Sequence, residues 1–145
     1  MICSNPRIWN IEQGLKLTVE QIERAEAQRV ALAQRALKFF EDYDLLLSPA
    51  TIVPPFPKQH RYVAECAGKK FDNYVEWLGI VYAITLACCP ALSLPCGFTA
   101  SGLPVGLQMV AKPHAEAELL AGAGMLEDIL GMRDRTPIDP WAAKS

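Results

Sequence analysis

The segment 77–111 contains no charged side chain, and this constrains the fold more than any other feature of the sequence. A helix that crosses a bilayer needs roughly 20 apolar residues, and 77–96 approaches that length. Pro90 and Pro95 interrupt it, because proline removes a helical hydrogen bond and clashes with the preceding turn. The residues after Pro90 have the pattern of a short buried strand. We therefore expect the interior of a globular protein and no membrane span.

The composition supports a folded domain and excludes several classes of function. Of the 145 residues, 51% are apolar and 21% charged, which is far from the composition of a disordered chain. The net charge is -2 without a basic block, so nucleic acid is not an expected partner. Five cysteines and two histidines without regular spacing predict no disulfide framework, metal site or other cofactor. The N-terminus lacks the pattern of a signal peptide, and we expect a cytoplasmic protein.

Three segments have the periodicity of helices. Thr18 and Gln21 have the spacing of a capping box, and apolar residues then recur at three- and four-residue steps to about residue 41. We expect this helix to lie on the surface of the core. A second helix is predicted over 115–130, where Gly131 stands just past its end. A third is predicted over about 72–88, with its start the less defined end.

Strands are predicted between these helices. The run 45–47 suits a strand buried on both faces, although the sequence does not identify its partner. The segments 91–98 and 104–111, joined by a short linker with a glycine, predict an antiparallel hairpin. A turn around 67–69 is expected, with short edge strands on either side as one interpretation.

Irregular structure is predicted for the remaining segments. The proline-rich segment 53–57 cannot donate a backbone hydrogen bond at three positions, and we expect a loop there. Residues 1–17 and the tail 131–145 are also expected to be irregular.

Two motifs connect the chain with a known family. Residues 90–98 read Pro-Ala-Leu-Ser-Leu-Pro-Cys-Gly-Phe, and residues 102–108 read Gly-Leu-Pro-Val-Gly-Leu-Gln. With these motifs and its order of elements, the segment from about 14 to 130 resembles the C-terminal part of amidase-signature enzymes. The resemblance implies an α/β fold with helices packed on a mixed sheet, and one partial amidase-type domain over 1–145.

The resemblance also implies where the chemistry lies. Amidase-signature enzymes hydrolyse or transfer amide groups with a serine nucleophile, a second serine in a cis peptide and a lysine. The family sets its serines in a Gly/Ser-rich stretch, and none occurs here. The serines of this chain stand apart from one another at positions 4, 48, 93, 101 and 145. We therefore expect no catalytic residue in this chain and no amidase activity from it alone.

Substrate contacts are expected on the helix that leads into the Pro-Ala strand. The resemblance implies that this helix borders the acyl side of the substrate pocket, and plain core packing is the alternative. The matching residues are Tyr74, Trp77, Leu78, Val81 and Tyr82. The resemblance implies that a glutamine-dependent member of the family holds the substrate ammonium with an aspartate in this segment, at the position of Leu78. No acidic residue lies between Trp77 and Pro90, so an apolar or aromatic amide is expected to fit better than glutamine. The cysteines at 88, 89 and 96 lie in the charge-free stretch, where we expect them to be buried and inert.

Two interpretations of function follow. In the first, the chain is a C-terminal segment of an amidase that contributes scaffold and part of the pocket, and a small-molecule amide is bound only by the complete enzyme. In the second, it is a self-standing, non-catalytic interaction module. An uncovered apolar face then pairs with a partner chain or with a second copy, and we expect an oligomer.

Overall fold

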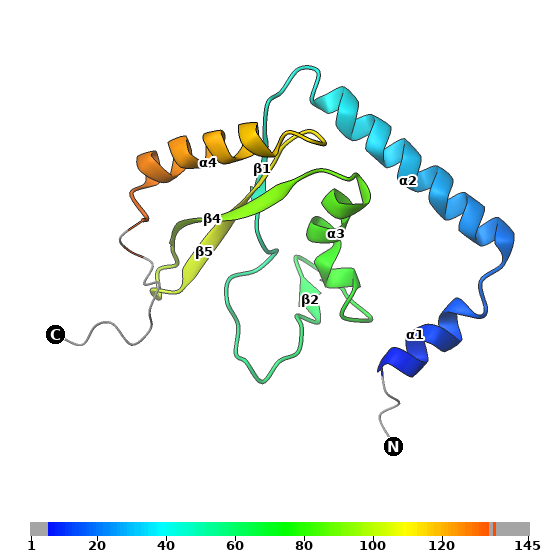
Figure 1. Ribbon diagram of the computed structural model, residues 1–145. Helices are drawn as coiled ribbons and strands as arrows, with labels where there is room; N and C mark the ends of the chain where they lie inside the picture. Colours follow the sequence, from blue (N-terminus) through cyan, green and yellow to red (C-terminus); the bar gives the residue numbers. More distant parts are fainter. Residues whose placement is uncertain (1–5, 134, 136–145) are drawn as a thin grey trace.

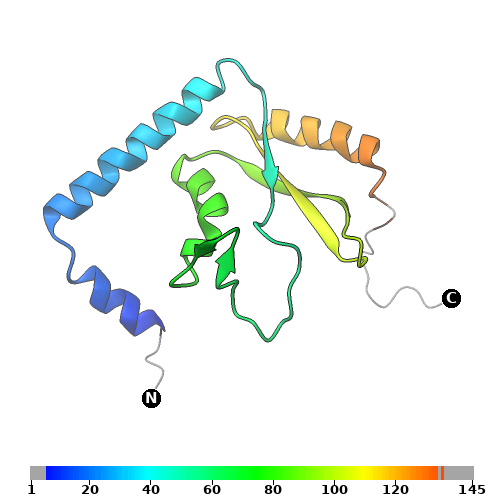
Figure 2. The ribbon, with the colours of Figure 1, turned by 180° about the vertical axis from the view of Figure 1, so that it is seen from behind.

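A computed structural model describes residues 6–133 and 135 of the chain (Figures 1 and 2). The helices are α1 (Pro6–Gly14), α2 (Val19–Phe39), the 3-10 turn η1 (Glu76–Leu78), α3 (Gly79–Leu86) and α4 (Glu116–Leu130). The strands are β1 (Leu46–Pro49), β2 (Glu65–Cys66), β3 (Lys69–Lys70), β4 (Ala91–Phe98) and β5 (Pro104–Val110). The α/β fold class predicted from the sequence is confirmed.

The larger sheet has the strand order β1-β5-β4, and its pairings are antiparallel. The predicted hairpin is confirmed as β4 and β5, with a bulge between Pro95 and Gly97. The strand that follows α2 pairs with β5, which supplies the partner that the sequence did not identify. Ser48 of β1 and Ser93 of β4 both lie opposite Gln108 of β5. Cross-strand neighbours share a face, so these three polar side chains form one row across the sheet.

Helix α4 covers the other face of this sheet and encloses the core (Figure 1). Met109, which is 1% exposed, packs there with Leu94 of β4 and with Leu119 and Ala123 of α4. The predicted end of the helix is confirmed, since Gly131 has the left-handed backbone (φ 60°) that glycine adopts without strain.

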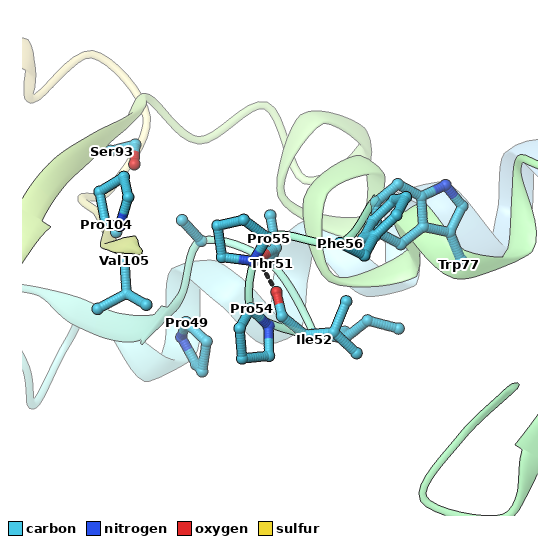
Figure 3. A pocket seen from close by; sticks show the side chains of 13 residues that line it. Pro49, Thr51, Ile52, Pro54, Pro55, Phe56, Trp77, Ser93, Pro104 and Val105 are labelled. Carbon is cyan, nitrogen blue, oxygen red and sulfur yellow. Dashed lines mark hydrogen bonds between the residues drawn. The ribbon is translucent and has the colours of Figure 1, made fainter. Parts of the chain in front are cut away.

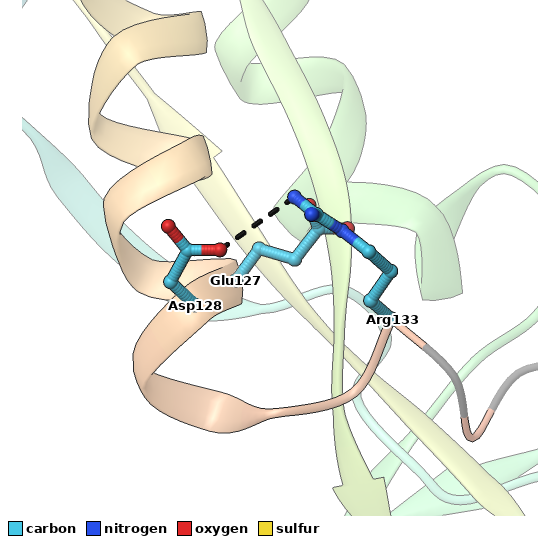
Figure 4. A network of polar contacts seen from close by, with 3 residues as sticks. All are labelled: Glu127, Asp128 and Arg133. Carbon is cyan, nitrogen blue, oxygen red and sulfur yellow. Dashed lines mark hydrogen bonds and ion pairs between the residues drawn. The ribbon is translucent and has the colours of Figure 1, made fainter.

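Just beyond the end of α4, the Arg133 guanidinium lies 2.9 Å from the Glu127 carboxylate and 3.6 Å from that of Asp128 (Figure 4). Arg133 and Asp128 are largely exposed and Glu127 is partly exposed, so the ion pairs contribute little to stability.

The prediction that 45–47 is buried on both faces is wrong. β1 lies at the edge of the sheet, and its side chains alternate between half-buried and exposed. Leu47 is 50% exposed although it is opposite Met109. The apolar run therefore forms the edge of a sheet with one partner strand.

Helix α2 forms as predicted but does not lie on the core. Its capping box is complete, because the Gln21 N–H donates to Thr18 Oγ1 (3.3 Å) and the Thr18 N–H donates to Gln21 Oε1 (2.9 Å). No residue of α2 is buried, and in both views the helix arches away from the sheet (Figures 1 and 2). Its exposed apolar residues include Ile22 (51%), Val30 (45%) and Leu37 (51%). The expected burial of this face is wrong for the described residues.

Two further boundaries differ from the prediction. Residues 6–14 form helix α1 instead of an irregular segment; Pro6 stands at its first position, where proline is favoured. The helix predicted from about 72 begins only at Glu76. Before it, Asn73 Oδ1 accepts the N–H groups of Val75 (2.9 Å) and Glu76 (3.2 Å). This local turn competes with a helical start and displaces it.

The expected turn at 67–69 is confirmed, with the short strands β2 and β3 on either side. Its residues Ala67 and Gly68 both have positive φ, as a tight hairpin turn requires. In the described part of the chain, no helix is long and apolar enough to span a bilayer. Most of the predicted irregular tail, 134 and 136–145, lies outside the described residues.

Candidate functional site

A pocket of about 480 Å³ lies between the loop that follows β1 and the hairpin β4–β5 (Figure 3). One wall is the segment 49–56, and the other consists of Ser93 and the segment 104–106. Trp77 of η1 closes one end. This volume falls within the range of about 300–1,000 Å³ that is usual for small-molecule sites.

The loop wall is held in place by its own backbone and by β5. The Ala50 N–H donates to the Gly106 carbonyl (3.0 Å), which extends the β1–β5 pairing into the loop. Thr51 Oγ1 donates to the Val53 carbonyl (2.6 Å), the dashed line in Figure 3. Pro54 and Pro55 then restrict the backbone, because the proline ring fixes φ. The sequence therefore forms a stiff, apolar wall.

The Trp77 end of the pocket is aromatic. The Phe56 ring meets the Trp77 ring edge-on at 5.7 Å between centroids, and Tyr74 meets Trp77 in the same manner at 6.2 Å. The indole Nε1 of Trp77 is buried and has no hydrogen-bond partner among the described residues. A buried donor without a partner costs about 1–3 kcal/mol. This end therefore offers ring surfaces and one unused donor beside the pocket.

The opposite end carries the polar row of the sheet, with Ser93 at the pocket (Figure 3). Gln108 is 7% exposed, and its Nε2 donates to Ser48 Oγ (3.0 Å) and to the Ile80 carbonyl (3.4 Å). The Ser93 hydroxyl, by contrast, has no partner in the described part of the chain. Gly106 leaves it room, since a Cβ at that position would lie 2.7 Å from Ser93 Oγ.

The structure brings together only some of the residues that the resemblance implied for a substrate pocket. Trp77 lines the pocket, and Tyr74 supports it through ring contact. Leu78, Val81 and Tyr82 lie outside its lining, and the last two are exposed on α3. Sequence reasoning missed the walls 49–56 and 104–106. The signal for the first was its prolines directly after a strand, where a stiff loop can shape a cavity.

The expected burial of the cysteines is wrong. Cys88 is exposed, while Cys89 and Cys96 are half-buried. Cys88 follows the end of α3 in a left-handed conformation (φ 58°), which takes it out of the helix and away from the core. Partial burial raises the pKa of the Cys89 thiol, and its neighbour Cys88 contributes in the same direction.

The described serines lack a base. The Ser48 hydroxyl faces the Gln108 amide and the Ser101 hydroxyl faces that of Thr99, whereas Ser93 has no partner. A serine nucleophile needs a group that takes its proton within hydrogen-bond reach, and an amide or hydroxyl does not serve. Within residues 6–133 and 135, the structure therefore shows no serine with a base within hydrogen-bond reach.

Comparisons with known proteins agree on one family. The family model described as Amidase matches residues 5–120. An acylamidase of Rhodococcus erythropolis is 32% identical over 130 residues, which cover 89% of this chain and 27% of that protein. A glutamyl-tRNA(Gln) amidotransferase subunit from Alkaliphilus metalliredigens is 36% identical over 100 residues, which cover 69% of this chain and 19% of that protein.

Solved structures show the same likeness. A crystal structure of an amidase superimposes with a TM-score of 0.75 and 29% identity, over 88% of this chain and 29% of that one. The chain thus spans about a quarter or less of the length of these curated relatives (27% and 19%). The family predicted from the two motifs is confirmed: this chain belongs to the amidase-signature family.

Proposed function

We propose that the chain supplies the scaffold and part of the substrate pocket of an amide hydrolase, in a single partial domain of the amidase type. The pocket lined by the segment 49–56 carries this proposal, because its volume suits a small-molecule ligand. The described serines have no base beside them, so the pocket can contribute binding without supplying the nucleophile. The nucleophile, its base and the donors to the oxyanion then come from a complementary amidase segment, and the chain has no activity alone. Its setting is cytoplasmic.

A chimera tests this role. The matched segment of the Rhodococcus erythropolis acylamidase is replaced by this chain, and hydrolysis of acetanilide is measured beside the chain alone. We expect turnover by the chimera and none by the chain. We also expect Ser48→Ala to leave turnover unchanged, since its hydroxyl faces Gln108 in the sheet. Turnover by the chain alone, or a folded chimera without turnover, contradicts the proposal.

The exposed face of α2 supports a second candidate, an interaction module without catalysis. The residues Ile22, Val30 and Leu37 recur at helical spacing and stay uncovered in the described chain. Uncovered apolar surface of this kind favours association. Light scattering coupled to size-exclusion chromatography measures the mass of the chain in solution. An oligomer that Val30→Lys dissociates and Glu23→Lys leaves intact supports the module; a monomer contradicts it.

A further inference from the structure

We propose that the pocket binds an uncharged aryl or alkyl group and discriminates against ligands with an ionised head group, such as a free α-amino acid. The inference rests on the proposed function, because it names the class of substrate that this pocket accepts. It follows from three properties of the pocket: the absence of charge in its lining, the aromatic surface at one end and the single free hydroxyl at the other.

Among the residues that the structure describes, no ionisable side chain lines the pocket. The segments 49–56 and 104–106 consist of apolar residues apart from Thr51, and Ser93 and Trp77 complete the set. An ionised group that leaves water needs a counter-charge or several hydrogen bonds to offset the loss of hydration. The pocket offers a carboxylate no cation and an ammonium no anion. A zwitterionic ligand therefore loses hydration on entering and gains little in return.

Two charged residues near the aromatic end, Glu76 and Arg61, have contacts of their own. The Glu76 carboxylate, next to Trp77 in the chain, accepts from the Asp72 N–H (3.0 Å) and from Asn73 Nδ2 (3.1 Å). The Arg61 guanidinium lies over the Tyr74 ring at 5.9 Å and does not line the pocket. Neither Glu76 nor Arg61 lines the pocket. The aromatic end of the pocket therefore offers ring surfaces and the uncharged indole N–H of Trp77.

The Ser93 hydroxyl is the main side-chain group of the pocket lining that can hydrogen-bond a ligand. Thr51 already donates its proton to the Val53 carbonyl, so its hydroxyl is left only as an acceptor. The Ser93 hydroxyl has no hydrogen-bond partner among the described residues, so it can both donate and accept. Figure 3 shows Ser93 and the pair Phe56–Trp77 at opposite ends. This arrangement fits a ligand with an apolar body against the rings and one uncharged polar group, such as an amide, at the serine.

Every residue of the pocket lining belongs to this chain, so here the chain alone is expected to bind an amide, unlike in the first interpretation from the sequence. Titration of the full chain with matched probes tests the inference. Pentanamide and glutamine have the same carbon chain and terminal amide, but only glutamine carries the charged head group; phenylacetamide adds a ring. The chain has 3 tryptophans, and Trp77→Phe identifies the indole N–H resonance of Trp77 in a proton–nitrogen correlation spectrum. We expect both uncharged amides to shift this resonance, phenylacetamide at the lower concentration. We expect glutamine to bind at least about tenfold more weakly.

A pair of serine variants locates the polar contact. Ser93→Ala is expected to weaken binding of phenylacetamide by about 2- to 10-fold, the usual effect of one hydrogen bond. Ser101→Ala removes a hydroxyl from the exposed hairpin loop, where it hydrogen-bonds Thr99 outside the pocket lining, and is expected to leave binding unchanged. Equal losses in the two variants overturn the assignment of Ser93.

Two results overturn the inference as a whole. One is glutamine binding as tightly as pentanamide, and the other is a Trp77 resonance that no uncharged amide shifts. The acetanilide chimera separates this failure from failure of the proposed function. A chimera that hydrolyses acetanilide while the chain prefers glutamine retains the function and refutes the selectivity. If the chimera folds but is inactive while the chain binds uncharged amides selectively, the selectivity is retained and the proposed function is refuted.

Discussion

A methyl group at position 106 is predicted to destabilise the protein and to narrow the pocket. An ideal Cβ on Gly106 lies 2.7 Å from Ser93 Oγ and 3.1 Å from the Ala50 Cβ. Ser93 can rotate, but Ala50 has no rotamer and its N–H is held 3.0 Å from the Gly106 carbonyl. Overpacking costs about 1–3 kcal/mol, whereas replacing a strand glycine by alanine recovers about 0.5–1 kcal/mol. We expect Gly106→Ala to lower the free energy of unfolding by about 1 kcal/mol.

Urea unfolding followed by far-ultraviolet circular dichroism measures this change. Gly124→Ala in α4 is the matched control, because nothing lies within 4 Å of its ideal Cβ. Gly124→Ala reduces the loss of backbone entropy on folding in the same way but introduces no clash, so it is expected to raise the free energy of unfolding by about 0.5–1 kcal/mol. The double variant Ser93→Ala/Gly106→Ala removes the shorter contact and retains the contact with Ala50. We expect a coupling energy of about 0.5–1 kcal/mol between the two positions.

Two results would refute this reasoning. If Gly106→Ala stabilises the chain as much as Gly124→Ala does, the backbone near Ala50 moves away from the new methyl group without loss of stability. The pocket wall formed by 49–56 is then not stiff. If the changes at Ser93 and Gly106 are additive, the serine hydroxyl does not occupy the space beside Gly106. The second result also removes the placement of Ser93 on which the binding inference depends.

Other substitutions test the polar row, the helix cap and the thiols. Gln108→Leu leaves two partly buried acceptors without their donor and is expected to cost about 1–3 kcal/mol in urea unfolding, more than Ser48→Ala at about 0.5–1.5 kcal/mol. Thr18→Ala removes one side of the capping box and is expected to cost about 1 kcal/mol, seen as lost helical circular dichroism. Iodoacetamide is expected to alkylate exposed Cys88 before Cys89, because the raised pKa of Cys89 leaves less thiolate at mildly alkaline pH. Tandem mass spectrometry, which assigns the label within the shared peptide, should show the difference narrowing as the pH rises.

The sequence predicted best those features that are encoded within a few residues. The capping box at Thr18 and Gln21, the hairpin of β4 and β5 and the left-handed Gly131 each depend on side-chain or backbone chemistry at short spacing. The two amidase motifs fall on the hairpin and its linker, and they identified the family. Such signals are the same in any tertiary context, and for this reason they carried over into the structure.

The features that were missed depend on contacts between distant segments. The pairing of β1 with β5 joins residues about sixty positions apart, and no local pattern specifies it. The pocket has the same origin, because its walls meet only when the loop after β1 lies against Gly106 and Ser93. Cys88 was assigned to the interior from an uncharged neighbourhood, yet the end of α3 turns it outward.

Helix α2 shows a conflict between sequence pattern and exposure, and the conflict is informative. A helix with apolar residues at Ile22, Val30 and Leu37 has the pattern of an element that packs on a core, yet none of these residues is buried. The chain spans 27% of the length of the acylamidase that it matches. Under the proposed function, the complementary amidase segment therefore covers this face of α2. The chimera should protect the amides of α2 from hydrogen exchange more strongly than the chain alone does, whereas equal protection would place that segment elsewhere.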